Sequence, residues 1–198
     1  MHYVYQETSF LMPNTGQGNA DVWHREIIDL MTDGKNQEGI QYLFKKDFSQ
    51  QLPESALVKL RAKTLPDALR PTEKRVEFAN GADIKLKLRL CTTRRKKQAV
   101  NGKDKTVESF ISPSDEGFID FLSAMLSNNG FELKEIISTN DLVVERIKKA
   151  KGGRSFVPWC DVSFTATVKN EESASVAYIK GIGRKKVFGT GMLEVISE

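Results

Sequence analysis

Strict alternation of apolar and polar residues is clearest at residues 84–90. There, isoleucine and leucine alternate with lysine and arginine without interruption. A period of two places the apolar side chains on one face of a β-strand and the cations on the other. This segment is therefore predicted to be a half-buried strand whose exposed face is basic. Other strand-like runs lie at residues 2–12, 40–48, 56–62 and 76–78.

A helical period follows the first of these strands. Its apolar stripe consists of Trp23, Ile27, Leu30 and Met31. Asn19 or Asp21 can cap the start of this helix, and His24 falls on the flank of the stripe, beside the core but not in it. Further along, Pro66 and Pro71 predict a short irregular or helical segment before the strand at 76–78.

The second half of the chain repeats this alternation of strands and helices. A helix is predicted to begin at 112–114 and to end at Gly130, with an apolar face made by Phe118, Phe121, Leu122, Met125 and Leu126. A second helix is predicted at 171–180. Strands are predicted at 131–137, 142–147, 157–168 and 192–196, and residues 148–154 resemble the tip of a hairpin.

The order of elements is β-α-β-β-(α)-β over the first 90 residues and similar over the rest, although no sequence repeat is visible. This is the ferredoxin-like order. The predicted fold class is α+β, with two tandem ferredoxin-like domains at 1–91 and 92–198 and a C-terminal glycine-rich loop.

Composition and charge narrow the class of protein. A chain of 198 residues with 39% apolar content can bury a globular core, and its net charge is only +4. From residue 92 onward, however, segments 94–105, 144–154 and 180–186 hold 15 cations and two acids, a charge of +13, whereas the remainder carries 2 − 12 = −10. Such separation is typical of a protein with a polyanion-binding face.

Cysteine usage and apolar content indicate the compartment. Cys91 and Cys160 are far apart and form no CxxC motif, so neither a zinc site nor a disulfide framework is indicated. The first residues lack the pattern of a signal peptide, and no apolar stretch approaches the length of about 18 that could cross a membrane. We expect a cytoplasmic protein without membrane contact.

A glycine-rich stretch, residues 181–191, precedes the last predicted strand. Gly181, Gly183, Gly189 and Gly191 can expose backbone N–H groups to an anion, and their neighbours Arg184, Lys185 and Lys186 add positive charge. A P-loop would need Ser or Thr after the lysine, where Val187 stands, and a dinucleotide fingerprint would need glycine at Lys186. The alternatives are a phosphate-binding loop and a helix C-cap followed by a tight turn.

The stretch from Gly181 to Leu193 is similar to the terminal motif of the CRISPR-associated repeat-processing endoribonucleases of the RAMP superfamily, CasE-type enzymes of Cascade systems in particular. The basic-faced strand at 84–90, which leads into a basic segment, and His24 in the first helix add to the resemblance. The family often has a tyrosine three residues before that histidine, where this chain has Asp21. Whether Tyr3, Tyr5 or a lysine supplies the second polar group of the site, in place of that tyrosine, is left open by the sequence.

The resemblance implies cleavage of precursor RNA without a metal ion or cofactor. The 2′-hydroxyl next to the scissile phosphate attacks it, which leaves a 2′,3′-cyclic phosphate and a 5′-hydroxyl. His24 is the candidate catalytic residue, as general base or acid, because an imidazole can serve either step near neutrality and His2, the other histidine, is next to the terminus. No Asp/Glu pair has metal-site spacing, which agrees with such chemistry.

The resemblance also implies that the product, the crRNA hairpin, stays bound and that the protein is a subunit of a Cascade-like effector complex. The predicted RNA-binding cations in the hairpin are Arg146, Lys148, Lys149, Lys151 and Arg154, and a second strip consists of Arg94, Arg95, Lys96 and Lys97. The alternative is a non-catalytic RNA-binding subunit or an RRM-like module, although neither basic-faced strand carries the aromatic pair of an RRM.

Overall fold

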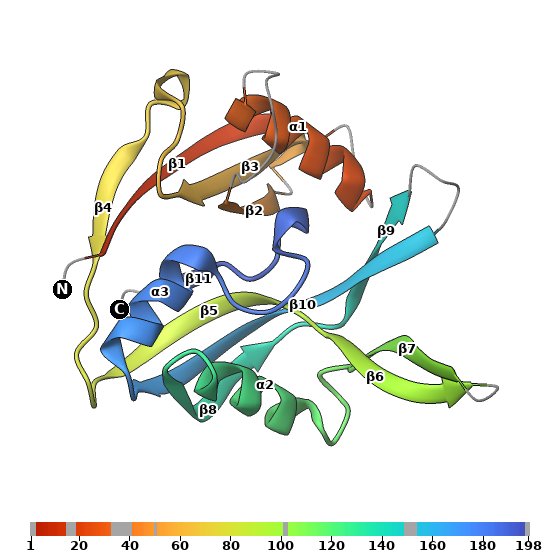
Figure 1. The fold of residues 1–198 in the computed structure, drawn as a ribbon. Coiled ribbons are helices and arrows are strands. Elements are labelled where there is room, and N and C mark those ends of the chain that lie inside the picture. The colour runs from red at the N-terminus through yellow and green to blue at the C-terminus, as the bar shows by residue number, and fades with distance from the viewer. Residues whose placement is uncertain are drawn as a thin grey trace.

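The computed structural model describes residues 3–14, 19–32, 41–49, 51–100, 103–148 and 154–196, and its two larger sheets are antiparallel (Figure 1). The first sheet has the strand order β2-β3-β1-β4. Its strands are β1 (Tyr3–Pro13), β2 (Tyr42–Ser49), β3 (Leu52–Ala62) and β4 (Thr72–Val76). Helix α1 (Ala20–Thr32) connects β1 to β2, and the 3-10 helix η1 (Asp67–Leu69) lies between β3 and β4. Read as 4-1-3-2, this is the ferredoxin-like order.

The second sheet has the order β11-β5-β10-β8, and β9 pairs with β10 beside this path. Its strands are β5 (Asp83–Cys91), β8 (Phe131–Thr139), β9 (Val143–Lys148), β10 (Arg154–Val168) and β11 (Leu193–Val195). Helix α2 (Phe118–Ser127) precedes β8, and α3 (Glu171–Lys180) follows β10. The order is again 4-1-3-2, so the predicted class, α+β with two tandem ferredoxin-like units, is confirmed.

Strand β5 belongs to the second sheet, whereas the sequence pattern assigned it to the first unit. It pairs with β10 from Cys91↔Trp159 to Asp83↔Thr167, and with β11 on its other side. Its leucines are buried with α2 and α3, which explains this choice of partner. Strand pairing therefore divides the chain between β4 and β5, differently from the predicted domains 1–91 and 92–198.

The basic segment after β5 forms a hairpin of its own. Strands β6 (Thr93–Val100) and β7 (Lys103–Phe110) make a two-stranded sheet that projects from the second unit (Figure 1). The predicted second domain, 92–198, begins with this segment. In the structure it is an insertion between the first strand and the first helix of that unit.

Helix α2 begins at Phe118, a few residues after the predicted start at 112–114. The N–H of Ser112 donates to the Asp115 carboxylate at 2.8 Å, and the N–H of Phe118 donates to the Asp115 carbonyl at 2.9 Å. Asp115 thus satisfies local backbone groups on both sides and holds this segment in turns.

Each sheet is covered by helices on one face. Trp23 and Ile27 of α1 are fully buried against Phe44 and Leu60 of the first sheet. In the second unit, α2 and α3 pack on the apolar face that β5 and β10 share. Among the helices that the structure describes, none is both long and apolar enough to cross a membrane.

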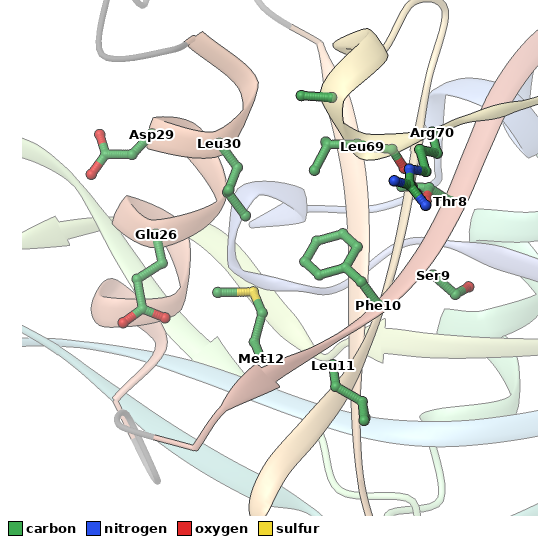
Figure 2. A pocket seen from close by; sticks show the side chains of 11 residues that line it. Thr8, Ser9, Phe10, Leu11, Met12, Glu26, Asp29, Leu30, Leu69 and Arg70 are labelled. Atoms are coloured by element: carbon green, nitrogen blue, oxygen red, sulfur yellow. Dashed lines mark hydrogen bonds between the residues drawn. The ribbon is translucent and has the colours of Figure 1, made fainter.

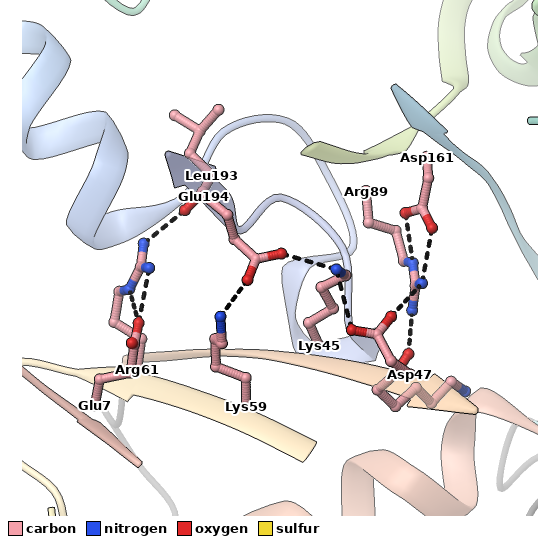
Figure 3. A network of polar contacts seen from close by, with 10 residues as sticks. Glu7, Lys45, Asp47, Lys59, Arg61, Arg89, Asp161, Leu193 and Glu194 are labelled. Carbon is pink, nitrogen blue, oxygen red and sulfur yellow. Dashed lines mark hydrogen bonds and ion pairs between the residues drawn. The ribbon is translucent and has the colours of Figure 1, made fainter. Parts of the chain in front are cut away.

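A network of ion pairs joins the two units (Figure 3). Arg61 on β3, 1% exposed, binds the Glu7 carboxylate and also donates to the carbonyls of Tyr178 and Leu193, at 2.8 and 2.9 Å. Glu194 accepts from Lys45 and Lys59 of the first sheet. Because a buried charge that loses its partner costs several kcal/mol, about 3–5, these contacts fix one arrangement of the units.

A second group of charges in the network centres on Arg89 of β5. Its guanidinium binds Asp161 at 3.0 Å and Asp47 at 3.2 Å, and it also donates to the Lys46 carbonyl (Figure 3). The Lys46 ammonium in turn binds Glu145 at 2.8 Å. Strand β2 is thereby attached to β5 and to β9 and β10, the two strands of the basic hairpin.

The two cysteines are buried free thiols on the paired strands β5 and β10. Burial raises the pKa of Cys160 to about 12, and the Asp161 carboxylate acts in the same direction. Since the thiolate is the reactive form, Cys160 is inert at physiological pH.

Candidate active site and RNA-binding surface

His24 lies on α1 where the helix meets the C-terminal glycine-rich loop. Its ring contacts the ring of Phe188 edge to face, with the centroids 5.3 Å apart. Phe188 ends the 3-10 helix η2 (Lys186–Phe188), which contacts both α1 and β2. The histidine is half-buried. The glycine loop and the first unit therefore meet at the candidate catalytic side chain.

Tyr42, at the start of β2, is the hydrogen-bond partner of His24. The His24 Nδ1 and Tyr42 Oη atoms are 2.9 Å apart. Tyr42 belongs to the buried cluster under α1, and burial raises the pKa of its phenol to about 12. Tyr42 is therefore a neutral phenol at physiological pH, and it holds the imidazole by Nδ1.

The pKa of His24 is lowered from its ordinary value of 6.5, chiefly because the ring is buried. The Asp21 carboxylate and the Val187 backbone act in the opposite direction without cancelling this effect. Asp21 is itself paired with Arg25, one helical turn further on. At pH 7 the imidazole is consequently neutral, the form that can accept a proton.

Sequence reasoning missed Tyr42 and named Tyr3, Tyr5 or a lysine as the source of a second polar group. The contacts of Tyr3 and Tyr5 are directed elsewhere. The ring of Tyr5 packs edge to face on the ring of Tyr178, with the centroids 5.9 Å apart, and Tyr3 faces Glu172. Tyr42 is placed beside His24 because β2 runs under α1 with Tyr42 and Phe44 in one cluster. The alternation of these two aromatics, read together with the stripe of α1, was the signal available in the sequence.

The glycines of the loop are required by the protein's own packing. Gly181, Gly183, Gly189 and Gly191 all have positive φ, between 71° and 87°. A Cβ on Gly181 would come within 2.5 Å of Leu43 Cδ2, and one on Gly191 would overlap the Ile182 carbonyl oxygen. The sequence pattern predicted that these glycines expose backbone N–H groups to an anion; at Gly181 and Gly191, the atoms that a Cβ would meet belong to the protein itself. Gly183, by contrast, is exposed at the outer turn.

Two of the three loop cations are held by main-chain carbonyls. Lys185 Nζ donates to the Phe156 carbonyl and lies 3.5 Å from the Glu108 carboxylate. Lys186 Nζ donates to the carbonyls of Lys180 and Gly181 at 3.0 and 3.3 Å, at the end of α3. Arg184 is exposed at the tip of the loop. Of these cations, Arg184 is the one that the structure presents most openly to solvent.

The hairpin of β9 and β10 lies beside α1. The backbones of Asn19, just before α1, and Arg146 of β9 form an isolated bridge. Under this contact, Ala20, Ile147 and Val157 form a small buried cluster against which Phe188 packs. The hairpin, the glycine loop and the His24 helix thus share one cluster, and the exposed Arg146 side chain stands at its edge.

The remaining predicted cations fall into three groups. Arg94 donates to the Gly117 carbonyl at 3.0 Å and lies over the Phe121 ring, and Arg95 pairs with Glu108 on β7. Strands β6, β9 and β10 contain the backbones of Lys96, Lys97, Lys148 and Arg154. Lys149 and Lys151 lie outside the described residues. A role in RNA binding stays a prediction for all of them.

A hollow of about 820 Å³ lies on the other part of the first unit, between β1, α1 and η1 (Figure 2). Its centre is apolar, with Phe10, Met12 and Leu30, and Glu26 and Asp29 lie along its helical side. No residue of the glycine loop or of the basic segments lines it. The hollow is separate from the His24 site because neither His24 nor Tyr42 lines it. Its carboxylates would also repel the phosphates of an RNA.

No three His, Cys, Asp or Glu side chains in the described part of the chain lie close enough together to hold a metal ion. What the geometry provides is an oriented neutral imidazole at the junction of two ferredoxin-like units, beside a basic hairpin. The protein is thus of the tandem ferredoxin-like class, with its candidate site between the units and the glycine loop.

A family model described as CRISPR associated protein matches residues 13–196. The chain belongs to this family, and the resemblance that the glycine motif indicated is confirmed. No curated protein matches the chain.

Solved structures of CRISPR proteins have the same fold. Thermus thermophilus Cse3, bound to an RNA representing a pre-cleavage complex, has a TM-score of 0.70 and 17% identity over 98% of this chain and 100% of that one. The CRISPR endoribonuclease Cse3 bound to a 19 nt RNA has a TM-score of 0.65 and 17% identity, covering 98% and 99%. A chain of a CRISPR RNA-guided surveillance complex in a pre-nicking state has a TM-score of 0.61 and 17% identity over 96% of this chain and 98% of that one.

Proposed function

We propose that the protein is a metal-independent endoribonuclease that cleaves the stem-loop repeats of precursor CRISPR RNA. The observation that carries this proposal is the His24 imidazole, which is neutral at pH 7, held at Nδ1 by Tyr42 and placed beside the basic hairpin. Membership of the CRISPR associated protein family and the fold shared with Cse3 support it. Cse3 is itself described as an endoribonuclease bound to RNA.

His24 acts as the general base in this proposal. This role requires the tautomer in which Nδ1–H donates to the oxygen of the neutral Tyr42 phenol, so that the Nε2 lone pair takes the proton of the attacking 2′-hydroxyl. The 2′-oxygen then forms a bond to phosphorus as the bond to the 5′-oxygen breaks. The leaving oxygen takes a proton from solvent, and the products are a 2′,3′-cyclic phosphate and a 5′-hydroxyl. A base of this kind contributes about 10²–10⁴-fold to the rate.

The RNA stem is bound on the side of His24 where α1 meets the hairpin. Arg146 is exposed there, beside Asn19, and Arg184 is exposed on the neighbouring glycine loop; neither has an ion pair among the described residues. Cations on a hairpin can follow the phosphates of an A-form stem, whose deep groove side chains do not read. The product hairpin stays bound, and the protein serves as a subunit of a Cascade-like effector complex, as the match to a surveillance-complex chain suggests.

Incubation with stem-loop repeat RNAs from the CRISPR arrays of the source genome tests the proposal. We expect one cut per repeat, no effect of a chelator, and complete inhibition by a 2′-deoxynucleotide immediately upstream of the cut. The upstream fragment should end in a cyclic phosphate. Tight binding of several repeats without cleavage would instead make the protein a non-catalytic RNA-binding subunit, and cleavage that a chelator abolishes would contradict the metal-free chemistry.

A further inference from the structure

A second cavity, of about 600 Å³, lies between the first sheet and the C-terminal segment. Strands β1 and β2 form one wall through Val4 and Tyr42, and α3 and the glycine loop form the other through Val176 and Val187. A volume of 300–1,000 Å³ is typical of sites that take a small molecule or one group of a larger one. The cavity is large enough for a nucleobase with its ribose.

This cavity shares two residues with the candidate active site. Tyr42 lines it and also binds His24 by its hydroxyl. Val187 lines it and precedes Phe188, whose ring contacts His24. The basic hairpin approaches α1 at a different place, next to Asn19. An RNA strand that passes from the β9–β10 hairpin over His24 can therefore continue into the cavity.

The charge of the lining favours a polyanion. Lys63, Lys180 and Lys186 are among the lining residues, and none of the described lining residues is Asp or Glu. Burial lowers the pKa of Lys186, and the charge of Lys180 acts in the same direction, which reflects the positive potential at this end of α3. The lining also contains the apolar side chains of Val4, Val176, Ile179 and Val187. Apolar walls with cations beside them suit a nucleobase attached to its phosphates.

We propose that this cavity binds an unpaired nucleotide of the RNA substrate that flanks the scissile phosphate on the side away from the stem. The inference rests on the proposed function, because it takes the His24 site as the place of cleavage. The base lies against the valines, and Lys63 and Lys180 contact the adjoining phosphates. A cavity of this kind sets which nucleotide is drawn across His24 and positions the 2′-hydroxyl for attack.

The test compares two RNAs, both with a 2′-deoxynucleotide at the cut so that the complexes are not cleaved. The short RNA ends at the scissile phosphate, and the long RNA continues for three unpaired nucleotides. We expect wild-type protein to bind the long RNA about tenfold more tightly, since one stacked base contributes ~1–3 kcal/mol and 1.4 kcal/mol corresponds to a factor of ten. The variant Val176→Trp, which fills the cavity, should lose this ratio and keep its affinity for the short RNA.

Leu30→Trp is the matched control, because it adds the same side chain to the separate acidic hollow. It should keep the tenfold ratio. If Val176→Trp does not fold, the double variant Lys63→Ala, Lys180→Ala replaces it, and the ratio should fall by a similar factor. A wild-type ratio near one, or an unchanged ratio in the cavity variants, overturns the inference.

Crosslinking separates failure of this inference from failure of the proposed function. With 4-thiouridine at the first unpaired position of the long RNA, we expect crosslinks in peptides that contain Tyr3, Tyr42 or Val187. Crosslinks confined to the β6–β7 or β9–β10 hairpins would overturn the inference. If wild-type protein crosslinks in the cavity but cuts no unmodified repeat, the catalytic proposal fails and the cavity assignment stands.

Discussion

The His24 imidazole and the Tyr42 phenol are joined by a hydrogen bond of 2.9 Å between α1 and the first residue of β2. Both rings are packed against neighbours, His24 against Phe188 and Tyr42 among the residues under α1. The side chain proposed as the base is thus held at one nitrogen by a group that does not ionise near neutrality. In the proposed mechanism, its other nitrogen accepts the proton of the substrate hydroxyl.

Substitution His24→Ala should slow cleavage by roughly 10²–10⁴-fold, because it removes the group that accepts the 2′-hydroxyl proton. RNA affinity should be nearly unchanged. Single-turnover rates and equilibrium binding of a 2′-deoxy RNA measure the two quantities separately.

The pH profile of cleavage by the wild-type protein provides a further check on this role. The base is active when neutral, and the pKa of His24 lies below 6.5 because the ring is buried. We therefore expect kcat/KM to rise with pH through a value below 6.5 and to level off by neutrality, with this limb absent in His24→Ala. A His24→Ala protein that folds and cuts at the wild-type rate would move the chemistry to another residue.

Tyr42→Phe should lower kcat by about tenfold and leave KM almost unchanged, since the imidazole loses the partner that orients it but remains able to accept a proton. Tyr5→Phe is the matched control: Tyr5 is also a buried tyrosine of the first sheet, but it packs against Tyr178 on α3. Equal loss of activity in both variants would indicate general damage to the sheet and not a positioning role for Tyr42.

Arg146→Ala should weaken binding of the stem-loop and reduce the slope of log K against log salt by up to about one, the contribution of one phosphate contact. Neutralising Lys148, Lys149 and Lys151 should reduce it by up to about one for each phosphate that is no longer bound. Lys169→Ala, which removes a cation paired with Glu132, serves as control and should leave the slope unchanged. An unchanged slope in all the hairpin variants would place the stem elsewhere.

Gly191→Ala should destabilise the fold by about 3 kcal/mol, because the new Cβ overlaps the Ile182 carbonyl oxygen and the backbone has a φ of 86°. Gly183→Ala should cost only about 1 kcal/mol, the usual penalty for an L-residue in this conformation, since its nearest neighbour is the flexible Met125 side chain. Urea unfolding of both variants measures the difference. Equal losses would contradict the assignment of Gly191 to internal packing.

Acid should weaken the fold through Glu194. Burial alone would raise the pKa of this carboxyl, but hydrogen bonds and charges from Lys45 and Lys59 outweigh it and lower the pKa to about 2. A lowered pKa contributes stability above the unfolded-state value, about 4.3, and this stability is lost as pH falls towards 2. The loss should be on the order of 3 kcal/mol.

Because the folded-state pKa of about 2 leaves much of this carboxyl ionised at pH 3, only about half of that stability is lost between pH 7 and pH 3. In Glu194→Gln the difference in unfolding free energy between pH 7 and pH 3 should therefore be smaller by roughly 1.5–2 kcal/mol. Glu73→Gln provides a control at an exposed carboxylate of β4. Indistinguishable pH dependence in the two variants would show that Glu194 is not the group that acid protonates.

Much of the fold could be predicted because it depends on local periodicity. The alternation at 84–90 and the stripe of α1 place those elements correctly, and α3 occupies the predicted residues 171–180. The partner of β5 could not be read in this way, because a leucine face does not specify which core it joins. That choice depends on helices and strands distant in sequence, α2, α3 and β10.

The candidate site, too, could be predicted only in part from local sequence. His24 could be named from its residue type, its position on the helix and the family resemblance. Its partner Tyr42 is brought to it by the packing of β2 under α1, and the uses of Lys185 and Lys186 depend on carbonyls of β10 and α3. Contacts of this kind join distant segments and leave no spacing motif in the sequence.

The placement of η2 against α1 and β2 has a consequence for protein synthesis. His24 is synthesised before strands β2 to β10, and Val187 and Phe188 are synthesised after them. The Leu193 carbonyl that Arg61 binds appears later still. A nascent chain that ends before residue 181 contains the histidine without the loop that encloses it, so the contacts of His24 with this loop can form only once translation has passed that point.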